Sequence, residues 1–286
     1  MPAIPIALDA KAILAEGPVW CARSNAFWWV DITGQILHRF TPATGTDATW
    51  PTPEPAGCLA LAADGRVVVA LASGLAWFDQ AAATFTQFLP IEADNPKTRL
   101  NDGRCDRQGR LWVGSMARAG GGPVGTLYRV DPPATLHTIR HPITVPNCTA
   151  FSPDGTTMYW ADTPTKQILA TSLDPETGAL GTPRVFATTP RGAPDGGTVD
   201  AEGHLWVALW DGSAIARYAP DGTLAELIDL PVRRPTCPCF GGPDLATLYI
   251  TSASIGLDSP QPGEGGIIAL DVGVRGLPET FFGGGS

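Results

Sequence analysis

The sequence has no long apolar run, no basic run and no signal-peptide pattern in residues 1–11. No stretch approaches the roughly 20 apolar residues that a membrane-spanning helix needs. We therefore expect a cytoplasmic protein without a membrane partner. The formal net charge is −9 and Lys and Arg are not clustered, which argues against a nucleic-acid partner because phosphate binding needs such clusters.

Cysteine pairs with zinc-site spacing are also missing. Six Cys are present, mostly far apart, and the one close pair is Cys237 and Cys239. A chain of this length does not need disulfides to stabilise its core, so we expect all six cysteines to be structural thiols. The alternative is a redox or metal-binding role for Cys237 and Cys239. We expect a monomer.

Turn-forming residues are abundant and spread along the whole chain. There are 33 Gly and 28 Pro, and only 16% of the residues are charged. This distribution favours many short strands joined by tight turns over helices or disorder.

A short apolar strand recurs six times, with an aromatic residue or Val at a fixed point. The recurring anchors are Trp29, Val68, Trp112, Tyr159, Trp206 and Tyr249. Each anchor strand follows a turn and precedes another strand, so one unit covers about 45 residues. This period is typical of the four-stranded blade of a β-propeller.

A closed ring would protect the edges that a single blade exposes, so the sequence predicts an all-β, six-bladed β-propeller. A β-sandwich and a parallel β-helix are the alternatives, and strict recurrence disfavours both. We assign residues 1–282 to a single domain and residues 283–286, Gly-Gly-Gly-Ser, to a linker or tail. A strand near residues 4–8 is expected to complete the last blade.

Stepping back 11 to 13 residues from each anchor gives the start of the first strand of each blade, which should line the central channel. The six residues there are Glu16, Gly57, Asn101, Asn147, Asp195 and Cys237. Four of them carry side-chain oxygens, which suit a hard divalent cation such as Ca²⁺, Mg²⁺ or Mn²⁺. Asn101 and Asp195 also stand next to turns, and each taken alone fits a simple turn residue equally well. Their joint recurrence favours a metal site in the channel.

Several motifs resemble the gluconolactonase, regucalcin and senescence marker protein family, in the expected order along the chain. They are Ala15-Glu16-Gly17-Pro18-Val19-Trp20, Arg99-Leu100-Asn101-Asp102-Gly103, Gly114-Ser115-Met116, Pro194-Asp195-Gly196 and Cys239-Phe240-Gly241-Gly242-Pro243-Asp244. The resemblance implies a six-bladed propeller that hydrolyses sugar-acid lactones with one divalent cation, whether Ca, Mn, Mg, Zn or Fe. It also implies that Glu16, Asn147 and Asp195 bind the metal and that Arg99 and Asn101 contact the substrate.

One position departs from the family pattern. Many members have an acidic residue shortly after the segment that matches Gly114-Ser115-Met116, whereas this chain has Ala117-Arg118-Ala119. We expect Arg118 to take the place of that acid and to alter which lactone is preferred.

The predicted mechanism needs a polarised carbonyl and an activated water. The metal would act as a Lewis acid, and Asp195 would be the catalytic general base. A Gly-x-Ser-x-Gly elbow is absent from the sequence, so a serine esterase lacks its usual motif. Two alternatives remain: a calcium-binding propeller whose metal is structural, and a related hydrolase acting on other lactones or phosphotriesters.

Overall fold

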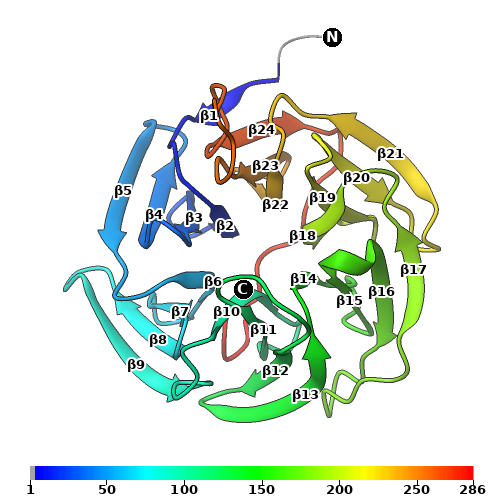
Figure 1. Ribbon diagram of the computed structural model, residues 1–286. Coiled ribbons are helices and arrows are strands. Elements are labelled where there is room, and N and C mark those ends of the chain that lie inside the picture. Colours follow the sequence, from blue (N-terminus) through cyan, green and yellow to red (C-terminus); the bar gives the residue numbers. More distant parts are fainter. Residues whose placement is uncertain (1–3, 286) are drawn as a thin grey trace.

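The computed structural model describes residues 4–285, whose strands form six four-stranded antiparallel sheets arranged in a ring (Figure 1). The prediction of an all-β, six-bladed propeller is confirmed. Within residues 4–285 the only helical segment is a 3-10 turn, η1 (Thr163–Thr165). Nothing helical in that part of the chain is long and apolar enough to cross a membrane.

The first strand of each blade lies next to the central channel, and the second strand carries the recurring anchor. The first strands are β2 (Ala15–Cys21), β6 (Ala56–Leu61), β10 (Thr98–Cys105), β14 (Pro146–Phe151), β18 (Ala193–Val199) and β22 (Pro235–Gly241). The second strands are β3 (Ala26–Asp31), β7 (Val67–Leu71), β11 (Leu111–Ala117), β15 (Thr157–Asp162), β19 (Leu205–Trp210) and β23 (Thr247–Ser252). Neighbouring first strands contact one another around the ring, including β2 with β22.

The third and fourth strands lie progressively further from the channel, and the fourth strands are largely exposed. The third strands are β4 (Ile36–Thr41), β8 (Gly74–Asp79), β12 (Gly125–Asp131), β16 (Gln167–Ser172), β20 (Ala214–Tyr218) and β24 (Ile267–Asp271). The fourth strands are β5 (Thr46–Pro51), β9 (Thr84–Pro90), β13 (Thr135–Ile143), β17 (Arg184–Thr188), β21 (Leu224–Asp229) and β1 (Ile6–Leu8).

The N-terminal strand closes the ring. β1 pairs with β24, with Ile6 opposite Ile268, and so becomes the outer strand of the last blade. This confirms the strand expected near residues 4–8. Joining the two ends of the chain in one sheet ties the first and last blades together and gives the last blade four strands like the others.

Apolar side chains fill the spaces between neighbouring blades. One cluster joins Trp28 and Val30 of the first blade to Leu59, Val69 and Phe78 of the second. Fully burying a side chain of this size contributes about 1.5–3 kcal/mol. The core is therefore distributed around the ring and holds the first strands at fixed positions.

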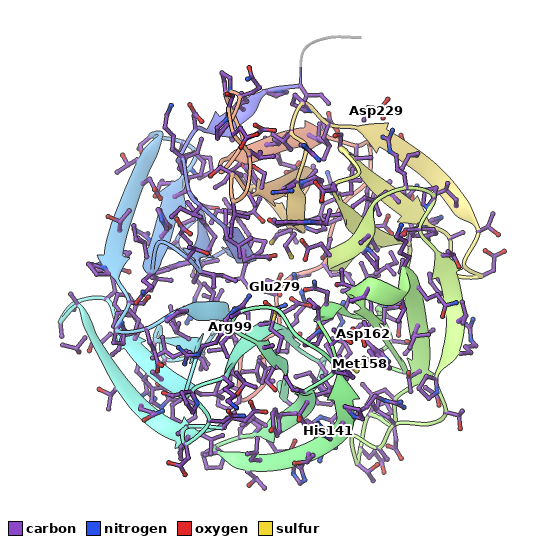
Figure 2. All side chains as sticks on the ribbon, viewed as in Figure 1. Arg99, His141, Met158, Asp162, Asp229 and Glu279 are labelled. Atoms are coloured by element: carbon purple, nitrogen blue, oxygen red, sulfur yellow. The ribbon has the colours of Figure 1, made fainter. Side chains whose placement is uncertain are left out.

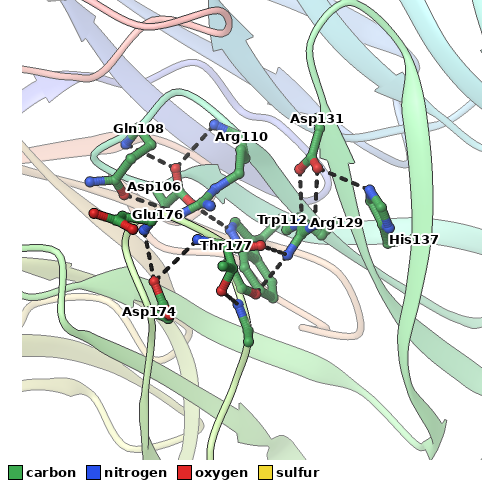
Figure 3. A network of polar contacts seen from close by, with 12 residues as sticks. Asp106, Gln108, Arg110, Trp112, Arg129, Asp131, His137, Asp174, Glu176 and Thr177 are labelled. Carbon is green, nitrogen blue, oxygen red and sulfur yellow. Dashed lines mark hydrogen bonds and ion pairs between the residues drawn. The ribbon is translucent and has the colours of Figure 1, made fainter.

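In two blades an aspartate in the turn between the first and second strands binds the anchor tryptophan. Trp112 Nε1 donates to Asp106 Oδ2 at 2.9 Å, and Trp206 Nε1 donates to Asp200 Oδ2 at 3.0 Å. Figure 3 shows the first of these networks, in which Arg110 Nε also donates to Asp106. This repeated arrangement fixes the turn against the blade.

The C-terminal segment (red in Figure 1) returns beneath the centre of the ring. Its residue Glu279 forms a partly buried ion pair with Arg104, near the end of first strand β10. Phe282 N donates to Leu61 O at 2.8 Å, and Gly283 N donates to Gly109 O at 3.0 Å. The boundary between domain and tail after residue 282 stays a prediction.

Candidate metal and substrate site

A β-bulge interrupts all six first strands close to the position predicted to face the channel. The pairing register with the second strand shifts at or beside Glu16, Gly57, Asn101, Asn147, Asp195 and Cys237. In a regular strand, successive side chains point to alternate faces. A bulge places two residues of one strand opposite a single residue of its partner and so changes the direction of a side chain. The bulges therefore interrupt the regular alternation of side chains near all six predicted channel positions.

Four of these six positions line a single cavity of about 330 Å³ at one end of the channel, namely Glu16, Asn101, Asn147 and Asp195. Arg99 also lines it, and Figure 2 shows this residue near the centre of the ring. The volume falls in the range typical of small-molecule sites.

The remaining two positions carry no oxygen ligand. A Cβ atom added at Gly57 would stand 2.5 Å from the carbonyl oxygens of both Leu100 and Asn101, so the close approach of two first strands leaves no room for a side chain. Cys237 is 2% exposed and is not among the residues that line the cavity. All six cysteines are buried free thiols, in agreement with the expected structural role.

The two carboxylates of the site are buried and close together. Glu16 is 8% exposed and Asp195 is 5% exposed. Burial, followed by the charge of Asp102, raises the pKa of Glu16 to about 8. Burial, followed by the charge of Glu16, also raises the pKa of Asp195 well above its usual range. Neither side chain is in an ion pair within residues 4–285, and the nearby charge of Arg99 lowers the pKa of Glu16 without offsetting the effect of burial.

The two amides are oriented by a chain of hydrogen bonds that crosses three blades. Arg99 Nη1 donates to Asn101 Oδ1 at 2.6 Å, and Asn101 Nδ2 donates to Asn147 Oδ1 at 3.2 Å. Asn147 Nδ2 donates to Thr163 Oγ1 at 2.9 Å, and that hydroxyl donates to Pro194 O at 2.9 Å. Because Asn101 Oδ1 already accepts a hydrogen bond from the Arg99 guanidinium, Asn101 is better suited to contact a substrate than to bind a metal.

Thr163 and Asp162 were missed by the sequence analysis, although both support the site. Asp162 accepts hydrogen bonds from Thr144 N at 3.0 Å and Val145 N at 2.9 Å, which holds the segment leading into Asn147. Figure 2 labels Asp162. The sequence offered one signal for Asp162, which is the aspartate that ends the strand carrying the anchor Tyr159.

The first blade repeats this support. Asp31 ends β3 and accepts hydrogen bonds from Ile13 N at 2.9 Å and Leu14 N at 3.0 Å, just before Glu16. Asp31 and Asp162 thus occupy matching places in two blades and anchor the segments that carry two of the predicted ligands.

These residues fit a hard divalent cation. Glu16 and Asp195 supply carboxylate oxygens and Asn147 supplies an amide oxygen, the donor types that Ca²⁺ and Mg²⁺ prefer. Two buried, mutually repelling carboxylates are costly without a cation, and a bound divalent ion would neutralise both. The cavity lining includes no His, which does not favour a His-rich zinc site.

A second acidic cluster is better explained as part of the fold. The ligand atoms of Asp200, Glu202 and His204 lie within 4.8 Å of one another. However, Arg217 Nη2 stands 2.7 Å from both Asp200 Oδ2 and Glu202 Oε2 and balances their charge. The same turn in the third blade has Arg110 where this one has His204, so the arrangement is a structural turn.

The chain belongs to the SMP-30/Gluconolactonase/LRE-like family, whose sequence model matches residues 14–254. It is 38% identical to L-arabinolactonase of Azospirillum brasilense, over 96% of this chain and 94% of that protein. It is 36% identical to 6-deoxy-6-sulfogluconolactonase of Pseudomonas putida, over 96% of both chains. The solved structure of a calcium-binding protein, regucalcin from Agrobacterium tumefaciens, superposes with a TM-score of 0.94 at 34% identity, covering 98% of this chain and 97% of that one.

These relatives confirm the resemblance found in the sequence and the prediction of a lactonase-type hydrolase. The roles of Glu16, Asn147 and Asp195 in metal binding, of Asp195 in catalysis, and of Arg99 and Asn101 in substrate binding stay predictions. The monomeric state and the cytoplasmic location also stay predictions.

Proposed function

We propose that the protein hydrolyses a sugar-acid lactone to the open aldonic acid, using one divalent cation held by Glu16, Asn147 and Asp195. The observation that carries the proposal is the convergence of these three oxygen donors with Arg99 and Asn101 in one cavity. The names of the lactonase relatives support sugar lactones as the substrate class.

The cation would act as a Lewis acid that polarises the lactone carbonyl and stabilises negative charge on its oxygen. Asp195 would accept the proton of the attacking water, because its carboxylate lies in the same cavity as the other donors. As ligands of the cation, Glu16 and Asn147 would determine where the carbonyl end of the substrate lies in the channel.

Arg99 and Asn101 would orient the sugar. Arg99 Nη1 is occupied by Leu100 O and Asn101 Oδ1, whereas no bond from Nε or Nη2 is found within residues 4–285. These donors can therefore bind substrate hydroxyls. Burial lowers the pKa of Arg99 to about 10, so the guanidinium remains charged at neutral pH.

A panel assay tests this proposal. The protein is stripped of metal with a chelator and then reconstituted separately with Ca²⁺, Mg²⁺, Mn²⁺, Zn²⁺ and Fe²⁺. Acid release is followed in a pH-stat with aldonolactones of pentoses and hexoses, simple alkyl lactones and a phosphotriester. We expect metal-dependent turnover, fastest on sugar lactones. Faster turnover of alkyl lactones or the phosphotriester than of every sugar lactone would contradict the proposed substrate class.

The second candidate is a calcium-binding protein with a structural metal, favoured by the likeness to a protein described as calcium-binding regucalcin. The two candidates differ in the need for Arg99, since a purely structural cation site does not need a guanidinium beside it. Stoichiometric Ca²⁺ binding without turnover of any lactone would favour this candidate.

A further inference from the structure

A row of three cations leads out of the cavity at one end of the third blade. Arg99 of β10 lies opposite Met116 of β11, and both line the cavity. Lys97 immediately precedes β10 and Arg118 immediately follows β11, so both lie just beyond this pair of residues. Arg118 N donates to Lys97 O at 2.9 Å, which confirms that these two are paired. We call Lys97, Arg99 and Arg118 the basic row.

Lys97 and Arg118, the outer residues of the basic row, have no acidic partner within residues 4–285, whereas the charges of Glu16 and Asp195 act on Arg99. None of the three side chains of the row is in an ion pair within residues 4–285, although other arginines pair with acids, such as Arg104, Arg110 and Arg217. The chain as a whole carries a formal net charge of −9, so acids are in excess elsewhere. The exposed positive charges of Lys97 and Arg118, next to the strand ends that carry Arg99 and Met116, create a local field that attracts anions.

Arg118 is held in place although it is exposed. Its Nε donates to Thr98 O at 2.7 Å, at the start of β10. This bond leaves both Nη groups without a partner within residues 4–285. Arg118 also lowers the pKa of Arg99, which shows that the two guanidinium groups are within electrostatic reach of each other.

The position of the cations determines which end of a substrate they would contact. In the proposed function the carbonyl of a lactone lies near Glu16, Asn147 and Asp195, which would hold the cation. Arg99 lies between that end and the outer pair, Lys97 and Arg118. An anionic group would therefore be favoured at the end of the substrate that is remote from the carbonyl.

Building on the proposed lactonase function, we infer that the preferred substrate carries an anionic group on the carbon farthest from the lactone carbonyl, bound by Lys97 and Arg118. The shared chemistry is that of a carboxylate, sulfonate or phosphate on a sugar lactone. Arginine binds all three through paired N–H donors. Arg118 is thus a specificity-determining residue.

A matched pair of substrates tests the inference in the metal-reconstituted protein. Galactono-1,4-lactone and galactaro-1,4-lactone differ only in a CH₂OH or a carboxylate at the remote carbon. Gluconolactone with a 6-sulfonate or a 6-phosphate distinguishes the other two anions. We expect kcat/KM for at least one anionic lactone to exceed that of its neutral parent by about tenfold, mainly through KM. The preference should shrink at 0.5 M salt, because salt screens exposed charges.

Two variants locate the effect. Arg118→Gln should reduce the anionic-to-neutral ratio of kcat/KM about tenfold, and Arg118→Glu should invert it. The control is Arg184→Gln, which changes an exposed arginine without an ion pair on the outer strand β17. It should leave the ratio as in the wild type.

The possible results separate the inference from the proposed function. Turnover of neutral lactones with no anionic preference would overturn the inference and leave lactonase activity intact. A preference that survives in Arg118→Glu would also overturn it. Failure to hydrolyse any lactone with any metal would refute the proposed function and the inference together.

Discussion

The buried carboxylates of the channel predict that the metal-free protein loses stability as the pH rises. The pKa of Glu16 is raised from its ordinary value of 4.5 to about 8, chiefly by burial. The folded state therefore holds a proton that the unfolded state releases. The resulting stability is fully present below pH 4.5 and is lost as the pH rises through 8.

The expected loss is large. One pKa unit corresponds to about 1.4 kcal/mol, so the rise from 4.5 to about 8 represents a loss on the order of 5 kcal/mol for Glu16. A folded domain has only about 5–15 kcal/mol of stability in total. Asp195 adds to the effect, since its pKa is raised in the same direction.

Glu16→Gln removes one of the two ionisable groups with little change in shape. The assay compares the free energy of urea unfolding of the metal-free wild type and variant between pH 5 and 9. We expect the variant to be at least about 2 kcal/mol more stable than the wild type at pH 8.5, and to differ little at pH 5. Saturating Ca²⁺ should reverse the order at pH 8.5, because the wild type binds the cation and the variant has lost a ligand.

The control is Asp64→Asn, which changes an exposed carboxylate whose pKa is lowered by the adjacent Arg66. It should not increase stability at high pH. If the metal-free wild type is as stable at pH 8.5 as at pH 5, or if Glu16→Gln is less stable at pH 8.5, the electrostatic reasoning is wrong.

Asp195→Ala should lower kcat/KM at least about 10³-fold and abolish stoichiometric metal in elemental analysis, because ligand and base are lost together; full activity would end the proposed mechanism. Arg99→Ala should lower kcat/KM on sugar lactones about 10–100-fold with unchanged metal content, and a loss of metal would contradict its assignment to the substrate. Thr163→Val should weaken metal affinity about tenfold in calorimetric titration by freeing the Asn147 amide, and unchanged affinity would argue against this positioning role. Gly57→Ala should cost about 1–3 kcal/mol in urea unfolding, whereas Gly122→Ala, with open space around its Cα, should cost little; equal effects would contradict the crowding at Gly57.

The blades were predictable because repetition makes one pattern visible six times. The anchors Trp29 and Trp206 are fully buried in second strands, as their aromatic character and β-rich surroundings predicted. The closing strand was predictable for a related reason, since a ring of blades must pair its two ends. A single short apolar segment such as Ile6–Leu8 would have carried little information without the repeat.

The channel positions were predictable to within a residue or two, but their orientation was not. Counting back from Tyr159 locates Asn147, whereas the bulge that redirects its side chain depends on pairing with β15. The bond from Asn147 to Thr163 depends on where the chain leaves that strand. Sequence spacing does not contain such contacts between segments, which exist only after the blades have packed.

The two ends of the channel differ in how their charge is balanced, and this difference explains why a cation would bind at only one of them. At the covered end, Glu279 from the C-terminal segment, labelled in Figure 2, pairs with the partly buried Arg104. Burial alone would lower the pKa of that guanidinium, but the charge of Glu279 is the main cause that raises it instead, so the pair stays ionised. At the cavity end, Glu16 and Asp195 repel each other and have no guanidinium in an ion pair within residues 4–285. Repulsion between two buried carboxylates weakens the fold unless a ligand neutralises it. The protein thus keeps at the open end two carboxyl groups with raised pKa values, which a divalent cation would bind in their ionised form.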